Sequence, residues 1–282
     1  MSSASLTVVL GLAAALVWGA GDFGGGLLSR RSPVYGVVLV SQVTGMLMVG
    51  AIALALGETI PAGPDLVICV VAGALGGLGI TMLYRGLAIG RMVIVAPVTG
   101  VLAAVIPVVA GFATEGVPGP VVLAGIVIAV VAVVLVSRVA DESGGREGLS
   151  EALIAGTTIG LFGVAIAQLS EGNVFSALTV IRLVQGVLVA GAVLLLRTAW
   201  RPGVSILPAL VAIGLLDTAG NAFYLLAVQT GQLAIASVLS AMYPVATVVL
   251  AMVVLREPIT RDHTVGIVLA GIAIALIGAG GG

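Results

Sequence analysis

Long apolar runs separated by short polar breaks make up nearly the whole chain. The runs are continuous rather than alternating, which predicts membrane-spanning helices and not the strands of a barrel. A spanning helix needs about 20 mostly apolar residues. Dividing the sequence at its charges, prolines and polar clusters gives ten such segments: 6–28, 34–56, 65–89, 92–112, 120–136, 150–169, 174–196, 206–228, 233–255 and 263–280. The pattern therefore predicts an all-α integral membrane protein with ten transmembrane helices.

Composition excludes a water-soluble domain. The 282 residues are 60% hydrophobic and 8% charged, whereas soluble domains carry roughly 25% charged residues. The one cysteine, Cys69, and the one histidine, His263, make neither a disulfide framework nor a metal cluster. We expect no cofactor, and the net charge of -1 gives no indication of nucleic acid binding.

The positions of the arginines predict an orientation in the bilayer. Arginines follow the odd-numbered segments, whereas the loops after even-numbered segments hold carboxylates. The arginines are Arg30, Arg31, Arg91, Arg138, Arg146, Arg197, Arg201, Arg256 and Arg261, and the carboxylates are Glu58, Asp65, Glu115 and Glu171. By the positive-inside rule, the odd-numbered loops are cytoplasmic and both termini lie outside. The expected location is the inner (plasma) membrane, as a multi-pass protein.

The two halves of the sequence resemble each other. The segment "LAGIVIAVVAVVLV" parallels "VGIVLAGIAIALIG", "SPVYGVVLVSQVTG" parallels "NVFSALTVIRLVQG", and Trp18 parallels Phe162. With five spans per half, the second half starts from the opposite side of the membrane, which is the inverted repeat typical of secondary transporters. We expect two inverted five-helix repeats over residues 1–140 and 150–282, joined by a connector over 141–149.

A more specific pattern lies in both halves. It consists of Trp18-Gly19 at the end of the first span, "SP" at the start of the second, and "SVLSAMYPVATVVLAMVVLREPITRDHTVGIVLAGIAIALIG" at residues 237–278. This pattern resembles the EamA-type families of the drug/metabolite transporter superfamily, and the resemblance covers nearly the whole chain. It implies ten helices and the export or import of small metabolites, energised by gradients rather than by ATP.

Two features depart from that family's pattern. Family members keep both termini in the cytoplasm, whereas the arginines of this chain predict the reverse. Members often carry an arginine in the second span where this chain has Gln42, and the equivalent position of the second half holds Arg182.

Residues 17–26, "VWGAGDFGGG", contain G-x-G-x-x-G and D-F-G, two motifs of soluble nucleotide-binding enzymes. The strand, helix start and companion elements that those motifs require are missing from the sequence around them. The glycines Gly21, Gly25 and Gly26 instead favour close packing of helices in lipid. The segment "GALGGLG" at residues 73–79 repeats this pattern.

Asp217 lies near the centre of the eighth segment, about 15–20 Å from either end. A charge at that depth costs at least ~2.5–3.5 kcal/mol and should face the interior of the bundle. Asn221 and Tyr224 follow on the same helical stripe. We predict that these three residues form part of a substrate-binding or coupling site, in which Arg182 balances Asp217 or contacts an anionic substrate group. The alternative is a purely structural ion pair between Arg182 and Asp217.

Asp22, near the cytoplasmic end of the first segment, lies at a depth similar to that of Arg85 in the third. The functional interpretation pairs these two residues, and the pair breaks during alternating access. In the alternative interpretation, Asp22 reaches the lipid interface.

Three prolines, Pro97, Pro107 and Pro244, lie inside the fourth and ninth segments and predict bends beside a shared cavity, since each removes a backbone hydrogen bond. Neutral hydrogen-bonding groups complete the predicted site: Thr99, Ser237, Ser240, Tyr243 and Thr247, with Gln42, Thr81, Tyr84 and Gln168 as further candidates. The alternative for each hydroxyl is a hydrogen bond to the backbone of its own helix.

The sequence thus predicts a secondary active or facilitative transporter of small metabolites (amino acids, sugars or drug-like compounds) that works by alternating access and is not an enzyme. Its expected partners are a small-molecule substrate and the lipid bilayer, with protons as a candidate coupling ion. We expect no nucleic acid partner, and a monomer or a homodimer as the assembly. No Walker A sequence is present, which argues against intrinsic ATP use. The alternatives are a membrane-embedded lipid-handling protein and an integral membrane enzyme.

Overall fold

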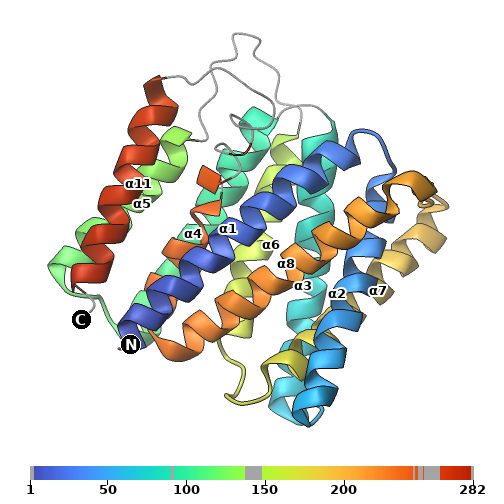
Figure 1. Cartoon of the computed structure of the whole chain (residues 1–282), viewed down its shortest axis with the longest axis horizontal. Helices are drawn as coiled ribbons and strands as arrows, with labels where there is room; N and C mark the ends of the chain where they lie inside the picture. Colours follow the sequence, from blue (N-terminus) through green and yellow to red (C-terminus); the bar gives the residue numbers. More distant parts are fainter. Residues whose placement is uncertain are drawn as a thin grey trace.

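The computed structural model describes residues 3–89, 92–136, 148–243, 245–246, 250 and 261–280, and within them the chain forms helices joined by short connections (Figure 1). The described part of the chain contains no strand. The helices are α1 (Ser3–Ser29), α2 (Val34–Leu56), α3 (Pro64–Ala88), α4 (Met92–Glu115), α5 (Pro120–Val136), α6 (Leu149–Ile166), α7 (Val174–Leu196), the 3-10 turn η1 (Val204–Ile206), α8 (Leu207–Thr230), α9 (Leu233–Ser240) and α11 (Arg261–Gly280).

Six helices of the described chain are long and apolar enough to cross a membrane: α1, α2, α3, α6, α7 and α8. Shorter apolar stretches lie in α4, α5 and α11, at Thr99–Glu115, Pro120–Ala132 and Thr264–Ile277. Large apolar side chains cover the outer surface; Leu54 is 84% exposed and Leu195 is 85% exposed. Such a surface is stable against lipid tails and not against water, so the chain is a membrane-embedded, multi-pass protein.

The predicted segments correspond closely to the helices wherever the structure describes both. The bounds of α2 and α7 coincide with the predicted segments 34–56 and 174–196. The predicted sixth segment runs to residue 169, whereas α6 ends at Ile166 and passes into a turn. Most of the connector (141–147) lies outside the described residues, as does much of the predicted ninth segment, including Pro244 and Thr247.

Packing between the helices pairs the first half of the chain with the second. Helix α1 packs on α8, and α6 packs on α3. If the helices are numbered within each half, the contact between α3 and α7 corresponds to that between α8 and α2. The contact between α4 and α6 likewise corresponds to that between α9 and α1. Helices α5 and α11 lie side by side at one edge of the molecule, and α2 and α7 lie at the opposite edge (Figure 1). These contacts between the two halves thus occur in matched pairs.

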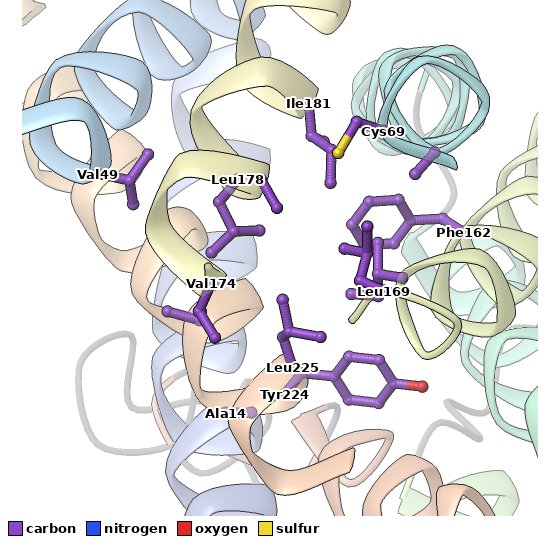
Figure 2. Close-up of a cluster of buried hydrophobic side chains, with 14 of the residues drawn as sticks. Ala14, Val49, Cys69, Phe162, Leu169, Val174, Leu178, Ile181, Tyr224 and Leu225 are labelled. Carbon is purple, nitrogen blue, oxygen red and sulfur yellow. The ribbon is translucent and has the colours of Figure 1, made fainter. Parts of the chain in front are cut away.

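Glycines allow these helices to approach closely, as the glycine pattern predicts. A methyl group on Gly73 of α3 would lie 2.6 Å from Cβ of Val184 in α7. Gly25 of α1 leaves the space that the ring of Tyr84 occupies. Around these contacts, buried side chains from several helices form an apolar cluster, and Figure 2 shows Cys69, Phe162 and Leu178 within it. The glycine-rich segments therefore serve helix packing.

Replacing Gly73 with alanine should destabilise the protein, because the new methyl group has no room between α3 and α7. We expect the free energy of unfolding to fall by about 1–3 kcal/mol, measured by thermal unfolding in detergent micelles. The matched control is Gly191→Ala on α7, since no neighbouring atom lies within 4 Å of a Cβ at that position. Equal losses of stability in the two variants would contradict the packing role of Gly73.

Candidate functional site

A cavity of about 90 Å³ lies among the helices and receives side chains from α1, α2, α3, α4, α6, α7, α8 and α9. Tyr243, which follows α9 in the sequence, also lines the cavity. Most of the predicted site residues line this cavity: Asp22, Arg182, Asp217, Asn221, Tyr224, Ser237, Ser240 and Tyr243. Folding therefore brings these residues together from both halves of the chain.

An ion pair between α7 and α8 forms the charged part of the cavity wall. Nη1 of Arg182 donates to Oδ2 of Asp217 over 2.5 Å and to Oε1 of Gln42 over 2.7 Å. The side chain of Arg182 is 1% exposed, and that of Asp217 is 14% exposed. A buried guanidinium requires such partners, because an unpaired charge in this surrounding is strongly destabilising. The predicted contact between Arg182 and Asp217 is present in the structure.

Space for the guanidinium comes from a missing side chain. A Cβ on Gly45 of α2 would lie 3.4 Å from Nε of Arg182 and would also clash with the hydroxyl of Thr218. Nε and Nη2 of Arg182 are buried and have no hydrogen-bond partner among the described residues. Asp217 and Gln42 therefore bind the guanidinium through Nη1, and the surrounding parts of α2 and α8 pack against it.

The α8 stripe extends the polar wall away from the ion pair, as its spacing predicts. Asp217, Asn221 and Tyr224 all reach the cavity. The hydroxyls of Tyr224 and Ser237 are hydrogen-bonded over 2.8 Å, which connects α8 to α9. Gly163 of α6 leaves room for the Tyr224 hydroxyl, since a Cβ there would lie 2.9 Å from it.

Trp18 of α1 fixes the opposite side of this wall. Its indole Nε1 donates to the backbone carbonyl of Asp217 over 3.2 Å, and its ring lies 5.8 Å from the ring of Tyr224, at an interplanar angle of 37°. Gly220 leaves the space that the indole fills. An aromatic residue and a buried donor thus anchor α1 to α8 beside the ion pair.

Helices α3 and α8 contribute different chemistry to the cavity at positions that are half the chain length apart in the sequence. On α3, Gly76, Ile80 and Leu83 line the cavity with the same spacing as the α8 stripe. Each of them precedes its α8 counterpart by half the length of the chain. The first half therefore supplies an apolar wall where the second half supplies a carboxylate, an amide and a phenol.

Two predicted site residues lie elsewhere, and the predicted pair of Asp22 with Arg85 is wrong. The side chain of Arg85 is 54% exposed, and its Nε lies 3.6 Å from Oε1 of Glu151. Arg85 extends toward the helix end, as long basic side chains do in membranes, whereas Asp22 lines the cavity. The hydroxyl of Thr99 donates to the carbonyl of Ala152 over 3.3 Å and fastens α4 to α6, so it does not belong to the cavity wall.

Of the further candidates from the sequence, some line the cavity and others bond within their own helix. Gln42 lines the cavity, whereas the Thr81 hydroxyl bonds the carbonyl of Gly77 in its own helix over 2.7 Å. Pro107 is buried within α4, and the side chain of Pro97 lies outside the described residues. Sequence reasoning missed Gln185, which also lines the cavity. Its position three residues after Arg182, on one face of α7, is a signal that could have found it.

A lipid-exposed helical bundle that encloses a cavity with an ion pair at its centre has the architecture of a membrane transporter. Residues 147–279, in the second half of the chain, match the model of the EamA-like transporter family, which is part of the drug/metabolite transporter superfamily. Members of this family are transporters rather than enzymes. The match confirms the predicted family over these residues.

The fold also has a known relative. A solved crystal structure of a protein with 19% sequence identity superposes with a TM-score of 0.79, over 98% of this chain and 98% of that one. At this identity the similarity extends to the fold. No curated protein matches the sequence.

Breaking the Arg182–Asp217 pair from one side should destabilise the protein strongly. Asp217→Asn leaves a buried guanidinium unpaired, and we expect its free energy of unfolding to fall by roughly 3–5 kcal/mol. The double variant Arg182→Gln with Asp217→Asn removes both charges and should recover much of that loss. Unfolding with a denaturing detergent is measured for the parent, for Asp217→Asn, for Arg182→Gln and for the double variant. Additive losses in the double variant would show that the two side chains do not depend on each other.

Proposed function

We propose that the protein is a ten-helix transporter made of two inverted five-helix repeats, over residues 1–140 and 150–282 with a connector at 141–149. The reciprocal packing of the two halves supports this arrangement. The contact between Gln42 and Arg182 supports it as well, since these residues occupy equivalent positions in the two halves. When a two-fold axis relates two repeats, equivalent residues contact each other only if they lie next to the axis.

We propose further that the cavity is the substrate site and that transport of small metabolites proceeds by alternating access. The observation that carries this proposal is the Arg182–Asp217 pair beside open space in the centre of the bundle. Charged residues within a membrane are costly and mark substrate or ion pathways. The residues assigned to substrate binding or coupling are Asp22, Arg182, Asp217, Asn221, Tyr224, Ser237, Ser240 and Tyr243.

The face formed by the even-numbered loops supplies a gate in this proposal. Glu58, after α2, accepts a hydrogen bond from the backbone N–H of Ser176 in α7 over 2.7 Å. Glu115, at the end of α4, accepts one from the backbone N–H of Leu233 in α9 over 2.9 Å. Each carboxylate caps a helix N-terminus of the other half, where the helix dipole favours negative charge. These contacts hold the halves together at one face of the membrane.

A substrate with a polar group fits this cavity better than a lipid does. The ion pair and the hydrogen-bonding side chains in the cavity wall give a polar group of a solute specific partners, whereas a lipid tail makes no use of them. We therefore place small polar or amphipathic metabolites ahead of lipid as the cargo. The orientation that we propose puts the arginine-rich loops in the cytoplasm, with the carboxylate-capped face outside.

Labelling with an impermeant reagent tests the orientation. In a Cys69→Ala background, Glu171→Cys lies in the loop before α7 and Ala199→Cys in the loop after it, and both positions are exposed. We expect a membrane-impermeant maleimide to label Glu171→Cys on intact cells and Ala199→Cys only after permeabilisation. The reverse pattern would overturn the orientation, and labelling of both on intact cells would overturn the spanning of α7.

Locking the capped face tests alternating access without knowledge of the substrate. The hydroxyl of Thr59 lies 3.5 Å from Oδ1 of Asn173, so these two side chains are adjacent, and we choose the two positions for a pair of cysteines to be bridged by oxidation. In the Cys69→Ala background, a reporter cysteine at the cavity residue Ala103 should then react with a small charged thiol reagent from the arginine-rich side only. Reaction from both sides of the locked protein, or from neither, would contradict the mechanism.

A further inference from the structure

The cavity is lined by more acidic groups than basic groups. Among the described lining residues, the carboxylates of Asp22 and Asp217 face a single cation, the guanidinium of Arg182. The guanidinium is paired with Asp217. Asp22 lines the same cavity, and the ion pairs of the described residues do not include it. The cavity wall therefore has one carboxyl group more than it has basic groups.

The geometry also hides the positive charge from anything inside the cavity. The side chain of Arg182 is 1% exposed, whereas that of Asp217 is 14% exposed. Its Nη1 is occupied by Asp217 and Gln42, and its Nε and Nη2 are buried. A solute in the cavity thus meets carboxylate oxygens, and the guanidinium lies behind them. An anionic group would have to displace this arrangement.

Aromatic rings surround the same space. Trp18, Phe162, Tyr224 and Tyr243 line the cavity from four different segments of the chain. The faces of aromatic rings attract cations, and the attraction is strongest where water is excluded. Carboxylates and aromatic faces together are the chemistry that recognises an organic ammonium ion.

We infer that the cavity binds a small organic cation, with its ammonium nitrogen at Asp22 and Asp217 and its apolar part against Ile80 and Leu83. This inference rests on the proposal that the cavity is the substrate site, and it adds the chemical class of the substrate. The volume of the cavity corresponds to roughly six to nine water-sized spaces, which suits a molecule with about that many non-hydrogen atoms. The bound ammonium group supplies Asp22 with the basic partner that it lacks among the described lining residues.

Three probes of one size separate charge from shape: benzylamine, which is protonated at neutral pH, benzyl alcohol, and benzoate. The chain has two tryptophans, Trp18 and Trp200, so Trp200→Phe leaves Trp18 as the reporter inside the cavity. We expect benzylamine to change the fluorescence of purified Trp200→Phe protein at concentrations at least roughly tenfold lower than those needed for the other two probes, since charge-assisted hydrogen bonds are the stronger ones.

Variants of the carboxylate assign the site. In the Trp200→Phe background, Asp22→Asn should weaken benzylamine binding by roughly tenfold to a hundredfold, whereas Asp22→Glu retains the charge and the preference for benzylamine. Asp262→Asn, at the exposed start of α11, is the matched control and should bind benzylamine like the parent. Equal loss in Asp22→Asn and Asp262→Asn would overturn the assignment to Asp22.

The outcomes distinguish this inference from the proposed function. If benzyl alcohol or benzoate binds as tightly as benzylamine, the cavity is a solute site without a preference for cations, so the inference fails and the proposed function stands. If none of the three probes changes Trp18 fluorescence, the inference fails together with the placement of the substrate site in this cavity.

Discussion

A charge inside the hydrocarbon layer is stable only where protein groups or enclosed water replace the hydration that it has lost, and this constraint organises the centre of the molecule. Arg182 can occupy the middle of α7 because Asp217 and Gln42 receive it from two other helices. Three helices that belong to different halves are therefore tied to one guanidinium. The cavity lies directly beside this cluster, so the ion pair also sets the electrostatics of the cavity wall.

The rest of the architecture serves that enclosure. Gly45 and Gly163 leave the space that the guanidinium and the Tyr224 hydroxyl occupy, and Gly220 does the same for Trp18. Without these gaps the aromatic and charged side chains could not lie inside a bundle of closely packed helices. Farther from the cavity, carboxylates of one half satisfy the backbone donors at helix starts of the other. The halves are thus connected both beside the cavity and at the ends of the helices.

Much of this could be predicted from the sequence, because apolar runs and a lone central charge are local signals. The bounds of α2 and α7, the α8 stripe and the partner of Asp217 follow from hydropathy, helical spacing and depth. Arg85 shows where such reasoning stops. Its depth matches that of Asp22, but the long side chain turns toward Glu151 at the helix end, and depth alone gives no direction. Gln185 and Thr99 depend likewise on which face of a helix meets which neighbour, and tertiary packing decides this.

The contact of Gln42 with Arg182 has a consequence for how such a molecule can be assembled. In a symmetric dimer of two identical five-helix chains, the same position would meet its own copy, so two guanidiniums would approach each other in a surrounding of low dielectric and repel strongly. A single polypeptide escapes this restriction, because one copy can keep the arginine while the other carries a neutral amide that accepts its hydrogen bond. Carrying both halves on one chain permits a single arginine at this contact, and with it a cavity whose two walls differ.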